Sequence, residues 1–273
     1  MKKTTCLLLL LCTLTAQAKV EFAYDASAEV TSAYLWRGQY LGGLSVQPNL
    51  GVGYEGEITS LMVSAWGNIG ASDYHWASPD CYFAPELDLS LAFSVYGINL
   101  GFTHYYYFGG SNFLCWKPLK ELVDNEWSST TEAMIGLDLS YWVEILPIYV
   151  NWYTTVAGYD PITAEDDTYK RAYSSYLELG CSFEWEKPGL SLDANIGFAP
   201  WACDLYGNSG FAIQCISARL DKTWEWEHWS LGIFAQGMIN PFGINKENAY
   251  INIAGEEKLG QTLNGCLGVN FAF

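Results

Sequence analysis

The sequence predicts an all-β fold: an antiparallel transmembrane β-barrel of about 12 strands, with short periplasmic turns and longer outer loops. Three observations predict it. Apolar and polar residues alternate along most of the chain, short and long connections follow one another in turn, and aromatic residues gather near the ends of the alternating segments. No stretch of comparable length repeats with the period of about 3.6 residues that a helix requires.

The alternation is clearest in residues 44–55, where Leu44 and Val46 share one face of a predicted strand. Ser45 and Gln47 lie on the other face, because successive side chains of a strand point to opposite sides. The same pattern predicts strands at residues 21–37, 44–55, 58–69, 84–95, 98–108, 130–141, 146–157, 173–185, 190–199, 211–221, 228–239 and 261–273.

The polar face distinguishes a membrane barrel from a soluble β-sandwich or lipocalin-like barrel. A soluble exterior carries Lys and Glu intermixed, whereas the polar positions here are mostly Gly, Ser, Asn, Thr and carboxylates. By strand parity, no charged side chain of a predicted strand lies on the apolar face. The apolar face is therefore expected to contact lipid, and the polar face is expected to line a lumen.

The lengths of the connections indicate the compartment. Connections after the even-numbered predicted strands are short, and most of those after the odd-numbered strands are long and polar or irregular. Outer-membrane barrels show this asymmetry, with their short turns in the periplasm. The sequence therefore predicts a bacterial outer-membrane barrel with both termini on the periplasmic side.

Aromatic side chains on the apolar face gather near strand ends, as in the girdles that membrane barrels place at both lipid–water interfaces. They are Phe22, Tyr24, Tyr34, Trp36, Tyr54, Phe93, Tyr106, Phe108, Tyr141, Phe183, Trp185, Trp229, Phe271 and Phe273. A C-terminal aromatic such as Phe273 resembles the signal read by the outer-membrane assembly machinery. That machinery, outer-membrane lipids and lipopolysaccharide are the predicted partners.

Residues 1–18 have the form of a cleaved secretory signal peptide. Lys2 and Lys3 make a positively charged start, residues 6–14 are mostly apolar, and residues 16–18 (Ala-Gln-Ala) fit a cleavage site. The chain is therefore expected to be exported.

The remainder, residues 19–273, is expected to form a single barrel domain. It carries 11 of the 13 Lys and Arg residues against all 30 Asp and Glu, a formal net charge of −19. A field of this sign argues against nucleic acid as a partner and favours cations. No apolar run in it reaches the roughly 18 residues of a transmembrane helix.

The segment "TSAYLWRGQYLGGLSVQPNLGVGY" resembles the start of the TorF-type porin family of exported bacterial barrels. The matching residues are Ser32, Tyr34, Arg37, Gly38 and Gln47. Trp66 and Asn68 in "VSAWGNIG" and Glu86 and Asp88 in "PELDL" are similar to two further strands of that family. The resemblance covers the first third of the chain and implies an outer-membrane channel, without a solute.

By strand parity, Trp36 faces lipid, and Arg37 faces the lumen near its outer mouth. Glu86, Asp88 and Glu132 are expected at a similar depth. The candidate residues of the lumen and its constriction are Arg37, Glu29, Glu86, Asp88, Glu132, Glu178 and Arg219.

Two roles are open for Arg37. A guanidinium grips carboxylates in pairs, so Arg37 either neutralises its neighbours and ties the wall together, or faces them across a constriction. Arg219 is expected lower in the lumen, near Glu184, Asp193 or Asp221.

The chain is not expected to be an enzyme or to bind a cofactor. A hydrolase requires a nucleophile with a positioned base, and His75, His104 and His228 lack such an arrangement in the sequence. Residues 165–167 (Glu-Asp-Asp) offer hard oxygen ligands, but their order does not fit an EF-hand loop. No metal site is therefore predicted.

Six cysteines follow the signal peptide, and export makes disulfide bonds possible. Cys81, Cys115 and Cys203 fall in or beside outer loops, and Cys215 lies a few residues along a strand. Their pairing stays open from spacing alone, although a bridge from Cys203 to Cys215 would close one outer loop.

These features together predict a porin-like passive channel for small solutes or ions, with a lumen that favours cations. The alternative is a closed barrel that serves as a structural protein or an adhesin without transport. The width of the lumen distinguishes the two, and several tyrosines on the lumen face are large enough to fill it: Tyr105, Tyr107, Tyr149, Tyr153 and Tyr176.

Overall fold

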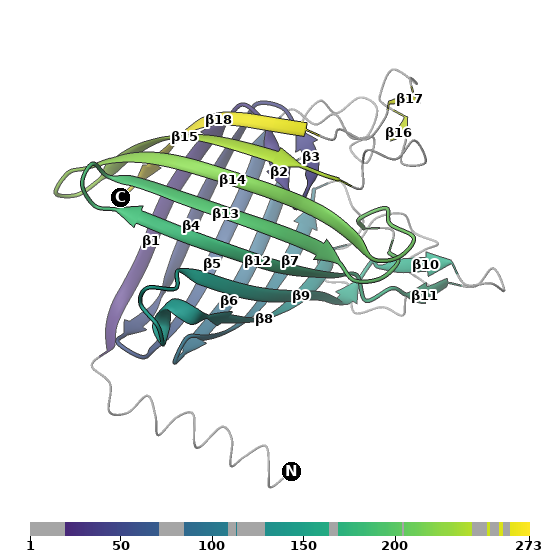
Figure 1. Ribbon diagram of the computed structural model, residues 1–273, viewed down its shortest axis with the longest axis horizontal. Helices are drawn as coiled ribbons and strands as arrows, with labels where there is room; N and C mark the ends of the chain where they lie inside the picture. Colours follow the sequence, from purple (N-terminus) through teal and green to yellow (C-terminus); the bar gives the residue numbers. More distant parts are fainter. Residues whose placement is uncertain are drawn as a thin grey trace, which may run out of the picture.

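The chain forms a closed antiparallel β-barrel of twelve strands (Figure 1). The computed structural model describes residues 20–70, 85–108, 113, 129–163, 169–203, 205–241, 250–251, 257–258 and 263–273. The predicted signal peptide lies outside these residues. The barrel strands are β1 (Val20–Thr31), β4 (Ser45–Gly56), β5 (Thr59–Gly70), β6 (Glu86–Val95), β7 (Ile98–Tyr107), β8 (Thr130–Asp138), β9 (Ile148–Gly158), β12 (Ser175–Trp185), β13 (Leu190–Ala199), β14 (Ala212–Glu225), β15 (Ser230–Ile239) and β18 (Leu263–Ala272). The predicted all-β antiparallel barrel is confirmed.

The barrel closes because β1 pairs with β18 as well as with β4. Val20 lies opposite Gly56 of β4, and Ala28 lies opposite Phe271 of β18. Every other barrel strand pairs with its neighbours in the chain order of the barrel strands. Closure removes the free sheet edges that would otherwise expose unpaired backbone groups.

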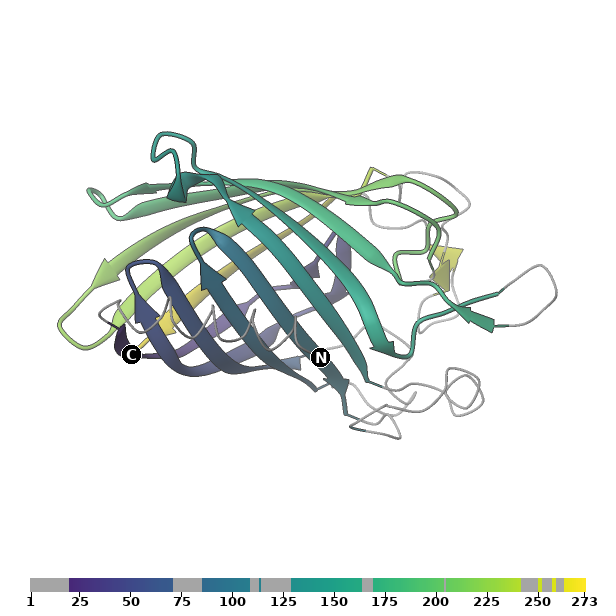
Figure 2. The same cartoon turned by 90° about the horizontal axis from the view of Figure 1, so that it is seen from below.

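The two ends of the barrel differ, as the connection lengths predict. One end, here called the turn end, carries the connections 57–58, 96–97, 139–147, 186–189 and 226–229, the third of which contains the 3₁₀ helix η1 (Leu139–Tyr141). The other end, the loop end, carries the connections 32–44, 71–85, 108–129, 159–174, 200–211 and 240–262. The barrel wall begins and finishes at the turn end, and Figure 2 shows the short strands of the longer connections, such as Pro161–Thr163 and Tyr169–Arg171, at the opposite end.

Three small two-stranded sheets belong to connections of the loop end. They are β2 (Tyr34–Trp36) with β3 (Gln39–Gly42), β10 (Pro161–Thr163) with β11 (Tyr169–Arg171), and β16 (Tyr250–Ile251) with β17 (Glu257–Lys258). Among the described residues, no helix is long and apolar enough to cross a membrane.

The wall is apolar outside and polar inside, which is the reverse of a soluble protein. Leu50 of β4 and Leu267 of β18 are 64% and 67% exposed, whereas Gln47 and Glu86 are buried inside the barrel. The buried side chains of the wall therefore point into the lumen, since the twelve strands form one closed sheet.

One strand boundary differs from its prediction because the chain leaves the wall early. Alternation predicts a first strand of residues 21–37, but β1 ends at Thr31. There the backbone N–H of Ser32 donates to the carbonyl of Leu267 at 2.9 Å, and the Ser32 Oγ accepts from the Leu267 N–H at 2.9 Å. The next residues turn into the barrel.

The end of β14 also differs from its prediction, and this puts a charged side chain on the outward face of the wall. β14 continues to Glu225, beyond the predicted limit of residue 221, so Lys222 shares the outward face with Trp224. The Lys222 Nζ lies 4.9 Å from the Trp224 ring centroid and donates to the carbonyls of Pro188 and Thr223. The ammonium thus extends toward the turn end, as long basic side chains do at an interface.

Candidate functional site

The connection after β1 folds back into the lumen as a short hairpin, Tyr34–Gly42, called the inner hairpin below. Its strands β2 and β3 pair so that Trp36 lies opposite Gln39. The two residues between them have positive φ values, 45° for Arg37 and 84° for Gly38. A type I′ turn requires positive φ at both positions. Arg37 therefore holds a backbone conformation that costs a non-glycine residue on the order of 1–3 kcal/mol.

The prediction that Trp36 faces lipid is wrong, because strand parity applies only while the chain stays in the wall. The Trp36 ring lies inside the barrel, stacked on Tyr206 with centroids 6.0 Å apart and edge-on to Tyr105 at 6.2 Å. Tyr34 also turns inward and packs on Trp66, a lumen-facing residue of β5, at 5.6 Å. The inner hairpin is thus packed between aromatic side chains of the lumen.

Arg37 joins the tip of the inner hairpin to β8 through a bidentate ion pair with Glu132. The Arg37 Nη1 lies 2.6 Å from Glu132 Oε2, and Nη2 lies 2.8 Å from Oε1. The two side chains are only 9% and 5% exposed. The Tyr105 hydroxyl donates to Glu132 Oε1 at 3.1 Å. Removal of either charge would leave the other one buried and unpaired, which is costly in a site this dry.

Aromatic rings surround the Arg37 guanidinium on several sides. Its Cζ lies 4.8 Å from the ring centroid of Trp36, 4.1 Å from that of Tyr153 and 4.8 Å from that of Tyr176. Arg37 Nη1 also donates to the Tyr206 hydroxyl at 2.9 Å. Burial raises the pKa of Tyr206 above its usual range, so that this hydroxyl stays neutral. Desolvated cation–π contacts add to the ion pair in holding the guanidinium.

Gly38 brings the tip against β14 and β15. Its N–H donates to Met238 Sδ at 3.2 Å, and its carbonyl accepts from Asn240 Nδ2 at 3.2 Å. A Cβ at this position would lie 1.8 Å from the Gln214 carbonyl oxygen. The tip therefore requires glycine for its close approach as well as for its φ. The inner hairpin crosses the lumen and contacts several walls of the barrel.

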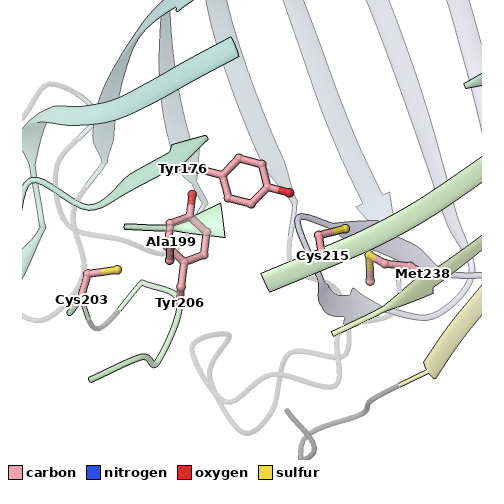
Figure 3. Close-up of a cluster of buried hydrophobic side chains, with 6 residues drawn as sticks. All are labelled: Tyr176, Ala199, Cys203, Tyr206, Cys215 and Met238. Atoms are coloured by element: carbon pink, nitrogen blue, oxygen red, sulfur yellow. The ribbon is translucent and has the colours of Figure 1, made fainter. Parts of the chain in front are cut away.

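A buried cluster surrounds the tip of the inner hairpin, with Leu35 and Trp36 packed against it. Its members come from β12, β13, β14, β15 and the connection 200–211. Figure 3 shows them: Tyr176, Ala199, Cys203, Tyr206, Cys215 and Met238. The hairpin thus rests on a fully packed surface at the loop end.

The bridge considered between Cys203 and Cys215 is not formed. Cys215 has a free thiol, and Figure 3 shows the Tyr206 ring between the two cysteines. The Cys203 Sγ instead donates to Asn208 Oδ1 at 3.2 Å. Cys81 and Cys115, the other loop candidates, lie outside the described residues.

A second charged cluster lies nearer the turn end. Arg219 Nη2 is 2.6 Å from Glu29 Oε1 and 2.9 Å from Asp221 Oδ1. The guanidinium also covers the Phe234 ring, with Cζ 3.7 Å from its centroid. Asp221 is one of the three neighbours predicted for Arg219, and Glu29 reaches the same cation from β1. These side chains are partly exposed, so breaking one of these ion pairs should cost less than breaking the one at Arg37.

Glu86 and Asp88 lie two residues apart on β6 and face the lumen. The Glu86 carboxyl lies within hydrogen-bonding reach of the Tyr34 hydroxyl of the inner hairpin. One oxygen of each acid, Glu86 Oε2 and Asp88 Oδ1, is buried without a hydrogen-bond partner. Glu178 faces the lumen from β12, within hydrogen-bonding reach of Asn151. The seven candidates thus form three groups: Arg37 with Glu132, Arg219 with Glu29, and Glu86 with Asp88. Glu178 lies beside the first group, near Arg37.

A chamber of about 320 Å³ lies in the lumen against the inner hairpin. Tyr34 and Trp36 line it from the hairpin, and Asp88 and Glu29 line it from the wall. Its lining combines two carboxylates and the Arg219 guanidinium with aromatic rings, which suits a small polar solute.

The tip is held chiefly by Tyr206, Gln214 and Met238, none of which was among the residues predicted for the site. They become neighbours of Gly38 only because the hairpin crosses the lumen. One local signal was present: Arg37-Gly38 interrupts an alternating run, and a glycine at the second position of a two-residue loop favours a tight hairpin.

The two histidines that the structure describes take no part in the lumen groups. His104 lies on the outward face, with Nδ1 2.9 Å from Thr131 Oγ1 and Nε2 2.6 Å from the carbonyl oxygen of Phe113. His228 is exposed at the turn end. His75 and residues 165–167 lie outside the described residues.

No protein-family model and no curated protein matches the chain. Among solved structures, it is similar to Salmonella typhi OmpF in complex with daunomycin, at 9% identity and a TM-score of 0.37 over 95% of this chain and 99% of that one. It is also similar to an outer membrane channel from Pseudomonas putida F1, at 11% identity and a TM-score of 0.42 over 93% of this chain and 94% of that one. For outer membrane phospholipase A from Escherichia coli, the identity is 11% and the TM-score is 0.39, over 92% of this chain and 92% of that one. Because these TM-scores lie below 0.5, the likenesses assign neither a family nor an activity.

Proposed function

We propose that this chain is an outer-membrane β-barrel that forms a narrow passive channel for small cations, with the inner hairpin as its constriction. The observation that carries the proposal is an acidic lumen inside an apolar wall. By strand parity the lumen receives Asp25, Glu29, Glu55, Glu86, Asp88, Glu132, Asp138, Glu178, Glu184, Asp193 and Asp221. Two arginines, Arg37 and Arg219, oppose them. Rings of carboxylates within a low-dielectric wall favour cations.

The outward face supports the membrane location. Phe22 of β1 is 65% exposed, Val52 of β4 is 54% exposed and Ile135 of β8 is 54% exposed. Apolar surface of this extent is rare on soluble monomers, whereas lipid solvates it. Outer-membrane lipids and lipopolysaccharide are therefore its proposed surroundings. The predicted signal peptide and Phe273 fit export and delivery to the outer-membrane assembly machinery.

The orientation of the barrel follows from its unequal ends, with the loop end outside the cell. An epitope tag inserted between β10 and β11 should bind antibody on intact cells. The same tag inserted at Glu186, in a turn-end connection, should bind only after the outer membrane is opened. The reverse pattern of binding would show that the orientation is wrong.

Ion selectivity tests the channel directly. The purified barrel in a planar bilayer should pass K⁺ in preference to Cl⁻, as measured by the reversal potential in a KCl gradient. The preference should weaken as salt rises, because the screening length falls from roughly 30 Å at 0.01 M to about 3 Å at 1 M. A preference for Cl⁻ in dilute KCl would contradict the acidic lumen as the selective element.

A second candidate is the closed structural or adhesin-type barrel. The inner hairpin favours it, because Arg37 and Glu132 are almost fully buried and the tip contacts β8, β14 and β15. A barrel that never conducts, even when the hairpin is undocked by mutation, would establish this second function instead of the channel.

Two further parts of the proposal rest on the sequence. The TorF-type motif around Arg37 and Gly38 supports membership of that porin family. His104 contacts the Thr131 hydroxyl on the outward face of the wall and His228 is exposed at the turn end, so neither histidine reaches the lumen, which supports a role without catalysis.

A further inference from the structure

The chamber beside the inner hairpin has an aromatic side. Tyr34 of the hairpin packs on Trp66 of β5, with ring centroids 5.6 Å apart. Trp36 of the hairpin lies edge-on to Tyr105 of β7 at 6.2 Å. All four rings line the chamber, and β5 and β7 are the two neighbours of β6 in the wall. The chamber thus offers a broad apolar surface to one face of a solute.

The other side of the chamber is polar. Arg219 of β14 and Gln236 of β15 line it there, and Glu29 reaches Arg219 from β1. β14 stands opposite β6, because six steps separate the two strands in either direction around the barrel. A solute in the chamber therefore meets aromatic rings on one side and hydrogen-bonding groups on the other.

We infer that this chamber binds a small uncharged polyhydroxylated ring, of the size of one pyranose sugar. Such a ring carries C–H groups on its face, which pack on aromatic rings, and hydroxyl groups around its edge, which both donate and accept hydrogen bonds. The chamber volume of about 320 Å³ lies near the lower end of small-molecule pockets, at roughly 300–1,000 Å³, and so fits a single ring. The inference goes beyond the proposed cation channel, because it names an uncharged solute and a bound state.

The partners of Arg219 exclude an anionic solute. Its Nε donates to Asp221 Oδ2 at 3.0 Å, and its Nη2 donates to Glu29 Oε1 at 2.6 Å. Two carboxylates thus occupy the guanidinium, and the Phe234 ring covers one of its faces. An anion would have to displace one of these carboxylates, which would then lose its countercharge.

The acids of the lining are engaged in the same way. Glu29 is paired with Arg219, and the Asp88 carboxyl lies within hydrogen-bonding reach of Glu86. A cationic solute would have to compete with Arg219 for Glu29, whereas a neutral solute leaves both arrangements in place. The charges of the lining therefore favour an uncharged ligand.

Neutral hydrogen-bonding groups of the lining stay unused. Gln236 Oε1 accepts from Cys266 Sγ at 3.8 Å, but among the described residues no hydrogen bond engages Gln236 Nε2. The same holds, within those residues, for the indole N–H groups of Trp36 and Trp66. Each of these N–H donors matches a hydroxyl oxygen of a sugar. The aromatic side thus supplies hydrogen bonds as well as apolar contact.

Saturation-transfer NMR tests the inference on the purified barrel, with methyl glucoside as the probe. A polyoxyethylene detergent is required, since it carries no sugar of its own. Irradiation of the aromatic protons should transfer saturation to the C–H protons of the glucoside. The signal should saturate with a dissociation constant of about 10⁻³–10⁻² M, as expected for a ligand with so few atoms. Choline, tested in parallel, represents an organic cation, which aromatic rings also attract.

Two substitutions test the two sides of the chamber separately. Trp66→Ala should weaken glucoside binding about tenfold or more, because it removes a ring and an N–H donor. Gln236→Ala should weaken it roughly three- to tenfold through the loss of one hydrogen bond. Trp224→Ala is the matched control, because it removes a tryptophan from the outward face of β14 and should leave binding unchanged.

Heat-modifiable gel migration should show that each variant is folded, and Gln236→Ala, the smaller change, decides the question if Trp66→Ala does not fold. The inference is overturned if the glucoside gives no saturable signal, if both variants bind it normally, or if choline binds and the glucoside does not. Cation-selective currents without glucoside binding would overturn this inference alone. Glucoside binding without K⁺ currents would support it and overturn only the channel.

Discussion

Arg37→Ala should undock the inner hairpin and raise the conductance of the barrel. The substitution leaves Glu132 as an unpaired charge that is 5% exposed, and breaking a buried ion pair typically costs about 3–5 kcal/mol. Because each 1.4 kcal/mol changes an equilibrium about tenfold, the undocked population should rise by roughly a hundredfold or more. Single-channel recording should show larger or longer openings, and amide hydrogen exchange of residues 34–42 should accelerate.

Two further variants separate the ion pair from a general loss of charge. Adding Glu132→Gln to Arg37→Ala should restore part of the docking, since the buried charge is then removed. Arg171→Ala is the matched control: Arg171 Nη1 donates to the carbonyl of Gly158 at 3.0 Å at the loop end, without touching the hairpin. Unchanged conductance and unchanged exchange in Arg37→Ala would mean that the ion pair does not hold the hairpin in place.

Gly38→Ala should undock the same hairpin without changing any charge. The new Cβ would lie 1.8 Å from the Gln214 carbonyl oxygen, and φ at this position is +84°. The methyl group therefore cannot be accommodated unless the tip withdraws, and the left-handed φ adds on the order of 1–3 kcal/mol. Conductance should rise as in Arg37→Ala, whereas the preference for K⁺ should be retained because Arg37 and its carboxylate neighbours remain.

Gly210→Ala is the control for this substitution. Gly210 lies in the loop-end connection 200–211, and a Cβ there meets nothing within 4 Å. Its conductance and hydrogen exchange should match the unmodified barrel. If Gly38→Ala also has the conductance and the hydrogen exchange of the unmodified barrel, the tip does not need its close contact with β14.

The barrel was predictable because its wall obeys one local rule. A strand with lipid on one face and a lumen on the other repeats every two residues, and this repeat located all twelve barrel strands. The same rule could not show where β1 ends. Tyr34 and Trp36 continue the alternation beyond Thr31, so an inward hairpin and a longer wall strand have the same pattern in the sequence.

Contacts of the candidate site could be predicted where they follow from the depth of a residue along its strand. Contacts that depend on the path of the inner hairpin could not be predicted. Depth along the strands placed Arg37 level with Glu132, and the structure brings the two side chains into contact. Tyr206 and Met238 could not be found in this way, because their contacts with the tip depend on how far the hairpin reaches across the lumen.

The contacts of the hairpin tip also determine when the lumen can close during biogenesis. The tip lies early in the sequence and is synthesised early, yet Gly38 contacts Met238, which lies 200 residues later. β14 and β15 must therefore be in place before the tip can be held, although the hairpin itself needs only local pairing. The nascent barrel should stay hydrated inside until its last strands pair with β1, so that docking of the hairpin follows completion of the wall. Because its contacts have high sequence separation, this final step should also be among the slower ones.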